Sequence, residues 1–198
     1  MKVAPAHRVN GQLRLPGDKS ISHRAALIAA LANGVSQLSN FSTSRDCAST
    51  LSCLKQLGIS ITRDSDVLSI AGRYELTKAE KPLDCGNSGS TMRMLAGILA
   101  TQDFSSELTG DESLRTRPMQ RIIEPLELMG AQIRSLERKP PLTIQGSRRL
   151  KTISYKLPIA SAQVKSCILF AALRADGHTE VIEKSSSRDH TERLFGAF

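Results

Sequence analysis

Apolar residues recur three or four positions apart in five parts of the chain, and shorter apolar runs lie between these parts. The helical spacing predicts helices over residues 20–32, 45–57, 88–100, 118–129 and 161–174, because residues so spaced share one helix face. The shorter runs predict strands over residues 131–136, 142–145 and 179–183, with a turn across 138–141. Helices alternate with strands, which predicts a mixed α/β (α+β) fold.

An internal repeat runs through this pattern. Residues 54–61 (LKQLGISI) recur as residues 126–133 (LELMGAQI), 72 positions later, and each copy is typical of a helix ended by glycine and followed by a strand. Residues 42–47 (STSRDC) recur as residues 185–190 (SSSRDH), 143 positions later, and the polar loop around Arg115 lies where a middle copy is expected. The chain therefore accommodates three βαβαββ units.

The third unit is expected to be cut short. Its second helix should begin near Asp189 and run for about a dozen residues, as in the other units. The sequence given reaches only Phe198. The alternative is a terminal helix that is simply short.

Composition places the chain among ordinary globular proteins. Its 198 residues are 40% hydrophobic and 23% charged, unlike a disordered, collagen-like or coiled-coil chain. The longest aliphatic stretch, residues 25–32, is far shorter than the roughly 20 residues that span a bilayer. No apolar signal segment opens the sequence, so a cytoplasmic location is expected. The four cysteines and four histidines lack metal-ligand spacing, so no metal site is expected.

The net charge of +8 indicates an anionic partner, either nucleic acid or a small phosphate compound. The chain has no Trp, two Tyr and five Phe, which leaves few rings on which single-stranded bases could stack. The composition therefore favours a small anion.

Small and polar residues mark the expected start of the first helix in each unit: GDKS at 17–20, CGNSGST at 85–91 and IASAQ at 159–163. Each stretch offers a capping Ser or Asn and free backbone N–H groups at the positive helix end, where anions bind. Basic residues lie near these and neighbouring helix starts: Lys19, Arg24, Arg93, Arg117, Lys165 and Arg188. If the units fold alike, these ends face a common cleft that holds more than one anionic group.

Five motifs together resemble the 3-phosphoshikimate 1-carboxyvinyltransferase (EPSP synthase) family of enolpyruvyltransferases. They are LPGDKSISHR at 15–24, GNSGSTMR at 86–93, GDESLRTRPM at 110–119, SAQVKS at 161–166 and SRDHTE at 187–192. Any one motif is a modest signal, but five in order with compatible spacing make a specific one.

The resemblance implies a transferase that moves the enolpyruvyl group of phosphoenolpyruvate to the 5-hydroxyl of shikimate 3-phosphate and releases phosphate, without a metal or organic cofactor. It also implies two similar domains of three βαβαββ units each, in a protein that is a monomer at full length. Residues 1–15 are then expected to pack on a missing C-terminal domain, and residues 16–198 to form an incomplete N-terminal enolpyruvyltransferase domain. Because closure of both domains is expected for catalysis, this chain alone is expected to lack turnover.

The resemblance also assigns site residues by motif position. Lys19 is expected to contact both substrates and to act in catalysis by electrostatic stabilisation. Shikimate 3-phosphate is assigned to Lys19, Ser20, Arg24, Ser161, Ala162, Gln163 and Arg188. Phosphoenolpyruvate is assigned to Lys19, Gly89, Arg117 and Gln163. The acid and base that move protons are expected beyond residue 198, whereas Asp46, Asp111 and Asp189 are expected to cap helices.

Two alternatives stay open. The related enolpyruvyltransferase that acts on UDP-N-acetylglucosamine commonly has a cysteine in the loop at 110–118 and Lys-Asn in place of Lys19-Ser20, and neither is present. A nucleic-acid-binding or RNA-end-processing protein can be built on a related repeat and would suit the charge of +8. The five motifs favour the phosphoshikimate enzyme over both, with no nucleic acid and no membrane as partners.

Overall fold

The computed structural model describes residues 2, 4–5, 8 and 10–198. The helices are α1 (Lys19–Leu31), α2 (Arg45–Gln56), α3 (Gly89–Leu99), α4 (Glu112–Arg115), α5 (Gln120–Leu128), α6 (Ala162–Ala172) and α7 (His190–Phe195). The strands are β1 (Gly34–Ser39), β2 (Ser60–Asp64), β3 (Val67–Gly72), β4 (Leu83–Asp84), β5 (Ser105–Thr109), β6 (Gln132–Leu136), β7 (Lys139–Gln145), β8 (Ser154–Lys156) and β9 (Glu180–Ile182). Within this described part of the chain, no helix is long and apolar enough to cross a membrane.

The repeat predicted from the sequence is confirmed in the element order. The second unit has the expected sequence of strands and helices from β4 to β7, with α4 as an addition. The first unit runs from α1 to β3, and the third unit runs from β8 to α7. β4 pairs in parallel with β5, and β8 pairs in parallel with β9, whereas β1 pairs only with β3 on its antiparallel side among the described strands.

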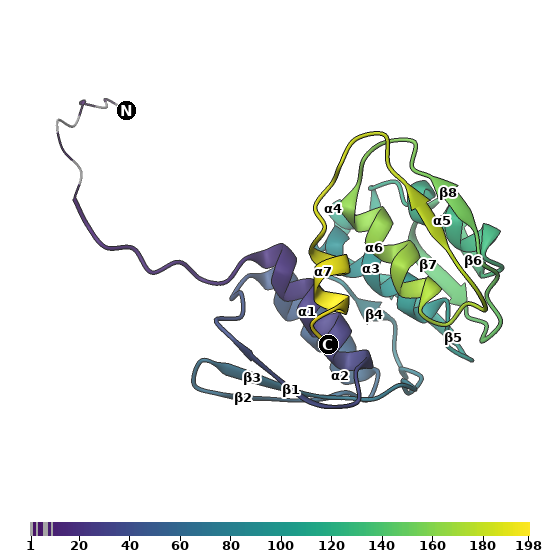
Figure 1. Ribbon diagram of the computed structural model, residues 1–198, viewed down its shortest axis with the longest axis horizontal. Coiled ribbons are helices and arrows are strands. Elements are labelled where there is room, and N and C mark those ends of the chain that lie inside the picture. Colours follow the sequence, from purple (N-terminus) through teal and green to yellow (C-terminus); the bar gives the residue numbers. More distant parts are fainter. Residues whose placement is uncertain (1, 3, 6–7, 9) are drawn as a thin grey trace.

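The helices form the centre of the molecule and the sheets lie outside them (Figure 1). The sheet β1-β3-β2 covers α1 and α2, and the sheet β4-β5-β7-β6 lies beyond α3 and α5. α1 is buried continuously from Ser22 to Ala30, because α2, α3, α7 and the first sheet surround it. Its apolar stretch is therefore a central helix rather than an amphipathic surface helix.

Caps explain why the helices begin where they do. Asp18, Ser44, Ser88 and Ser161 each accept a hydrogen bond from the backbone N–H three residues further on. The glycines of the repeated motif explain two helix ends. Gly58 and Gly130 follow α2 and α5 with φ of +86° and +101°, in the left-handed region that glycine adopts without strain.

The turn predicted across residues 138–141 is wrong. Glu137 and Arg138 form the turn, both with positive φ, and Leu136 pairs with Lys139. The two prolines that suggested the turn lie inside β7, beside the irregularity in its register with β6. Because a proline lacks the N–H that a regular ladder needs, this irregular stretch accommodates them.

The second helix of the middle unit also differs from its prediction. It begins at Gln120 instead of residue 118, and α4 forms ahead of it within the stretch expected to be a polar loop. The cause is Asp111, whose carboxylate accepts a hydrogen bond from the Leu114 N–H at 2.7 Å and starts a helical turn.

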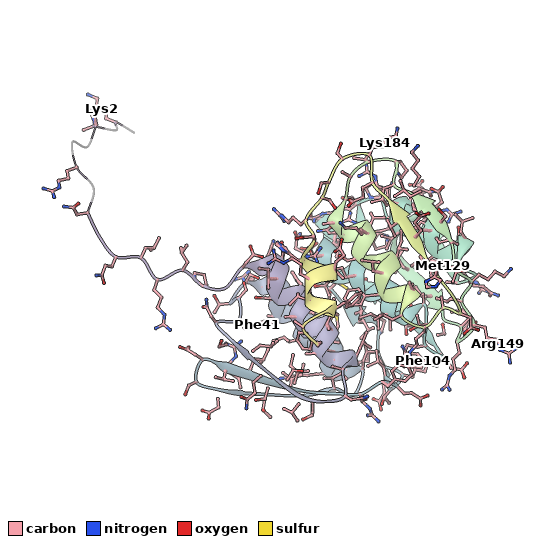
Figure 2. All side chains as sticks on the ribbon, viewed as in Figure 1. Lys2, Phe41, Phe104, Met129, Arg149 and Lys184 are labelled. Atoms are coloured by element: carbon pink, nitrogen blue, oxygen red, sulfur yellow. The ribbon has the colours of Figure 1, made fainter. Side chains whose placement is uncertain are left out.

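The N-terminal segment extends away from this body (Figures 1 and 2). Leu13 and Leu15 are 82% and 66% exposed. Residues 1, 3, 6, 7 and 9 of the segment predicted to pack on another domain lie outside the described residues.

Candidate active site

The first turns of three helices meet at one cavity of about 490 Å³. α1 contributes Ser20 and Arg24, and α3 contributes Ser90. The start of α6 and the segment before α7 complete the lining: Ala160, Ser161, Ala162, Gln163, Ser186, Ser187 and Arg188. The cavity therefore collects every residue assigned to shikimate 3-phosphate except Lys19.

The caps of these three helices leave amide donors at the cavity. Asp18, Ser88 and Ser161 each accept from one N–H in the first turn of their helix, at Ile21, Thr91 and Val164. The other first-turn N–H groups have no partner inside the helix. Three positive helix ends at one cavity favour an anion there.

Arg24 joins three elements at the floor of the cavity. Its Nε donates to Thr191 Oγ1 at 2.8 Å and its Nη1 donates to the Ser20 carbonyl at 2.9 Å. Its Nη2 donates to the Ala162 carbonyl and to Ser166 Oγ. Burial lowers the pKa of Arg24, but an arginine keeps its proton. These bonds connect α1 to α6 and α7. One of the five N–H donors of the guanidinium remains for a ligand.

Gln163 connects the cavity to a second group of cations. Its Oε1 accepts from Arg93 Nη1 at 3.0 Å, and its Nε2 donates to Ser90 Oγ at 2.8 Å. Arg93 lies against Gly89, where an added Cβ would come within 2.6 Å of Arg93 Nη1 and 3.6 Å of Arg117 Nη1. The lack of a side chain at Gly89 therefore lets the Arg93 guanidinium pack against the start of α3, with Arg117 close by.

Arg117 is oriented by polar neighbours. Its Nη2 donates to Asn87 Oδ1 at 2.6 Å, and Asn87 Nδ2 donates in turn to both carboxylate oxygens of Asp111. The bonds from Leu114 and Asn87 lower the pKa of Asp111, so it is ionised at neutral pH. For Arg93, burial lowers the pKa first and Arg117 adds to the lowering, as expected where two guanidinium groups lie close together.

Lys19 points toward α2. Its Nζ lies 2.8 Å from Asp46 Oδ2, and both side chains are partly exposed. Asp46 is not the cap expected from the sequence, because Ser44 caps α2 and Asp46 lies in the first turn. Asp189 does occupy the N-cap position of α7, but its side chain makes no capping hydrogen bond there. Asp111 does cap its helix.

Polar contacts fix the segment that carries Arg188. Arg188 Nη1 donates to Ser20 Oγ at 3.2 Å across the cavity. Lys165 lies 2.7 Å from carboxylate oxygens of both Glu183 and Glu192. Burial works to lower the pKa of Lys165, but its bonds to the two carboxylates outweigh this and raise it. The positive charge of Lys165 is therefore balanced by two carboxylates of the protein. Arg24, Arg93 and Arg188, around the cavity, have no such ion pair among the described residues.

The structure adds residues that the sequence-based assignment omitted. Ser90, Ser186 and Ser187 line the cavity, and Arg93 contacts Gln163. Arg93 was expected from the sequence near a helix start but was assigned to no substrate, although it lies one helical turn after Gly89 on the same face of α3. Ser186 and Ser187 belong to the repeated serine-arginine motif.

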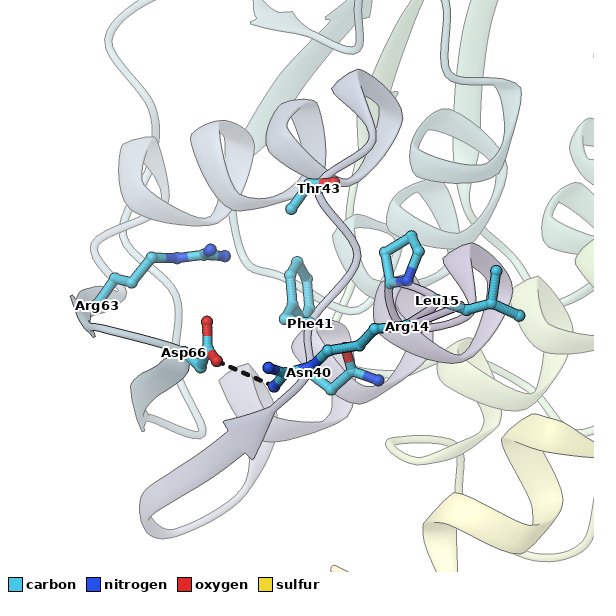
Figure 3. A pocket seen from close by; sticks show the side chains of 8 residues that line it. Arg14, Leu15, Asn40, Phe41, Thr43, Arg63 and Asp66 are labelled. Carbon is cyan, nitrogen blue, oxygen red and sulfur yellow. Dashed lines mark hydrogen bonds and ion pairs between the residues drawn. The ribbon is translucent and has the colours of Figure 1, made fainter. Parts of the chain in front are cut away.

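A second cavity of about 400 Å³ lies where the N-terminal segment meets the first sheet (Figure 3). Arg14 and Asp66 pair across it at 3.4 Å, and Phe41 and Arg63 lie beside them. It contains no residue of the assigned sites. In the described part of the chain, no group of three His, Cys, Asp or Glu residues is placed to hold a metal ion.

Comparisons with known proteins lead to one family. The family model described as EPSP synthase (3-phosphoshikimate 1-carboxyvinyltransferase) matches residues 3–198. The 3-phosphoshikimate 1-carboxyvinyltransferase of Koribacter versatilis is 52% identical over 200 residues, which cover 100% of this chain and 47% of the relative. That of Solibacter usitatus is 52% identical over 202 residues, which cover 99% of this chain and 47% of the relative.

Solved structures give the same result. The EPSP synthase from Acinetobacter baumannii superposes with a TM-score of 0.91 at 45% identity, over 95% of this chain and 43% of that chain. The chain thus spans about half the length of the curated relatives it matches.

Proposed function

Because the chain belongs to the EPSP synthase family, we propose that its cavity binds shikimate 3-phosphate for transfer of the enolpyruvyl group of phosphoenolpyruvate to the 5-hydroxyl, with release of phosphate. The observation that carries this proposal is the meeting of three helix N-termini at one cavity whose lining includes Ser20, Arg24 and Arg188. A phosphate there would replace water as the partner of otherwise unpaired amides and of a guanidinium.

The second anionic substrate fits the neighbouring cations. We assign phosphoenolpyruvate to the group formed by Gly89, Arg93 and Arg117, because both guanidinium groups lie near the Gly89 backbone. Gln163 links this space to the cavity and is placed to touch both substrates. We propose that Lys19 supplies a mobile positive charge as negative charge shifts from the enolpyruvyl group to the departing phosphate.

Proton transfer is not assigned to the acidic residues near the cavity. Asp46 pairs with Lys19, and Asp111 caps α4 and accepts from Asn87. We propose that this chain binds substrate without turnover. Residues 1–15 would pack on another domain, which suits the exposure of Leu13 and Leu15 and the absence, among the described residues, of a strand equivalent to β4 ahead of α1.

A cytoplasmic location and a monomeric full-length enzyme complete the proposal. Light scattering behind a sizing column measures the second point directly. The nucleic-acid alternative has no support in the comparisons described above, which lead to the EPSP synthase family.

Ligand-dependent stability tests the proposal. A compound that binds only the folded chain raises its melting temperature in a saturable manner. We expect shikimate 3-phosphate to do so, and UDP-N-acetylglucosamine and a short RNA, each at low and high salt, to leave the midpoint unchanged. Arg188→Gln should weaken shikimate 3-phosphate binding about tenfold, because it removes a charge-assisted bond. Arg193→Gln removes the same charge from an exposed position on α7 and is the matched control.

Three outcomes would contradict the proposal. One is a cooperative melt that shikimate 3-phosphate does not shift. Another is a shift caused only by RNA at low salt, which would restore the nucleic-acid alternative. The third is an equal loss of affinity in both arginine variants, because binding would then depend on net charge rather than on the cavity.

A further inference from the structure

A ring of polar contacts begins and ends on the first turns of α1. Lys19 Nζ contacts the Asp46 carboxylate at 2.8 Å, and the Asp46 carbonyl accepts from Thr91 Oγ1 at 3.3 Å. Thr91 Oγ1 lies 2.7 Å from Thr50 Oγ1, which lies 2.7 Å from His23 Nδ1. Lys19 and His23 are one helical turn apart on α1, so the ring closes through that helix.

The ring also reaches the start of α3. Thr91 Oγ1 also lies 2.8 Å from Ser88 Oγ, an alternative acceptor for its one proton, and Ser88 Oγ accepts the N–H of Thr91 as the cap of α3. Gly89 and Ser90, which belong to the two proposed anion sites, are the residues between this cap and Thr91. One connected set of hydroxyls thus fixes the first turn of α3 against α1 and α2.

His23 is neutral and buried in this ring. Its side chain has no exposed surface, and burial lowers its pKa to about 4. Asp46 opposes that shift, whereas Lys19 and Arg24 add to it. Its Nε2 is buried and is without a hydrogen-bond partner among the described residues. A neutral imidazole bonded on one side only is an uncommon arrangement that calls for a reason.

The contacts select a tautomer. If Nδ1 carries the proton, His23 donates to Thr50, Thr50 donates to Thr91, and Thr91 donates to the Asp46 carbonyl or to Ser88. The hydroxyl protons of Thr50 and Thr91 then each have an acceptor, and the unpaired Nε2 is a bare acceptor. The other tautomer would bury an N–H without a partner, which is the rarer defect.

We propose that His23, Thr50 and Thr91 are positioning residues, which hold the Lys19–Asp46 pair and the start of α3 at the spacing that both anion sites require, with His23 in the Nδ1-protonated form. This inference rests on the proposed function for its ligand, but its geometry stands apart from any ligand. None of the three residues lines the cavity of about 490 Å³. Their effect on substrate must therefore pass through Lys19, Gly89 and Ser90.

Hydroxyl removal at constant shape tests the proposal. Thr50→Val deletes the central link of the ring, and Thr50→Ser restores it. The matched control is Thr101→Val, because Thr101 is equally buried and bonded, to the Ile98 carbonyl, but lies just beyond the opposite end of α3. Melting temperatures measure the structural cost of each variant. Calorimetric titration measures affinity for shikimate 3-phosphate, and nuclear magnetic resonance follows the backbone amides of Lys19 and Gly89.

The expected result separates positioning from mere stability. Thr50→Val and Thr101→Val should lower the melting temperature by similar amounts, but only Thr50→Val should weaken shikimate 3-phosphate binding, by about tenfold. It should also move the amide signals of Lys19 and Gly89 together, and Thr50→Ser should restore both signals and affinity. In the wild type, the imidazole nitrogen spectrum should show a protonated Nδ1 and an unprotonated Nε2.

Three results would overturn the inference: unmoved Lys19 and Gly89 amides in Thr50→Val, affinity lost equally in the Thr101 control, or a protonated Nε2. If the wild-type chain binds no shikimate 3-phosphate, the proposed function of the cavity fails. The amide and imidazole signals then still decide whether the ring positions Lys19 and Gly89.

Discussion

Acid should destabilise this fold through one buried imidazole. In the unfolded chain His23 binds a proton with its ordinary pKa of 6.5, whereas burial in the folded chain lowers the pKa to about 4. Between these pH values the unfolded state holds more protons, so stability is complete above the unfolded pKa and falls as the pH decreases. For these two pKa values, lowering the pH from about 7.5 to about 5 removes about 2 kcal/mol of unfolding free energy.

The assay is urea unfolding of the wild type and of His23→Asn at both pH values. Asparagine places a polar atom near the position of Nδ1 but does not titrate in this range. The variant loses packing at every pH, so the informative quantity is the change in stability between the two pH values. Depressed pKa values of carboxyl groups such as Glu183 affect both proteins alike and cancel in the comparison.

The wild type should lose about 2 kcal/mol more than the variant when the pH is lowered. Equal losses would refute the reasoning, because His23 would then be protonated to the same extent in the folded and unfolded chains. A smaller difference would mean that Asp46, which favours the protonated form, offsets a larger part of the effect of burial.

Two further predictions concern packing and buried charge. Gly97→Ala would place a Cβ 2.1 Å from the Cys167 carbonyl oxygen, so α3 and α6 must separate. We expect the free energy of unfolding, measured with a chemical denaturant, to fall by about 2–3 kcal/mol. An unchanged unfolding midpoint would contradict the close approach of the two helices. Lys165→Met should leave the carboxylates of Glu183 and Glu192 close together without a counterion. We expect this variant to lower the free energy of unfolding by about 2 kcal/mol in the same assay. A gain in stability would show that apolar contacts outweigh the ion pairs.

The sequence predicted the helices best where a local chemical signal marked an end. α1 and α3 lie within two residues of their predicted ranges, and Ser88 is a cap of the type expected from the sequence, whereas α1 is capped by Asp18 instead of the expected Ser or Asn. Gly58 and Gly130 likewise identified the ends of α2 and α5 and exposed the repeat. The turn at residues 138–141 failed because proline is a signal for turns, while here the irregular register of β7 accepts it.

The candidate site was predicted less evenly. The motifs identified the residues around the larger cavity, but they could not show that Lys165 is neutralised by Glu183 and Glu192, which are distant in the sequence. They also could not show that most donors of Arg24 are engaged within the protein. The bonds of Arg24 depend on the packing of the third unit against the first, and the pairs of Lys165 depend on packing within the third unit. Local sequence patterns carry no information about either.

The first sheet ends in a strand that lacks the parallel neighbour present in the other two units. β1 has no other described strand on its outer side, and its six residues, GVSQLS, contain no charge and no proline. Natural edge strands usually carry such residues, because a bare row of backbone donors and acceptors recruits further strands. We therefore expect self-association at high concentration to involve this short stretch of backbone, and expect Val35→Lys at its exposed position to reduce that association.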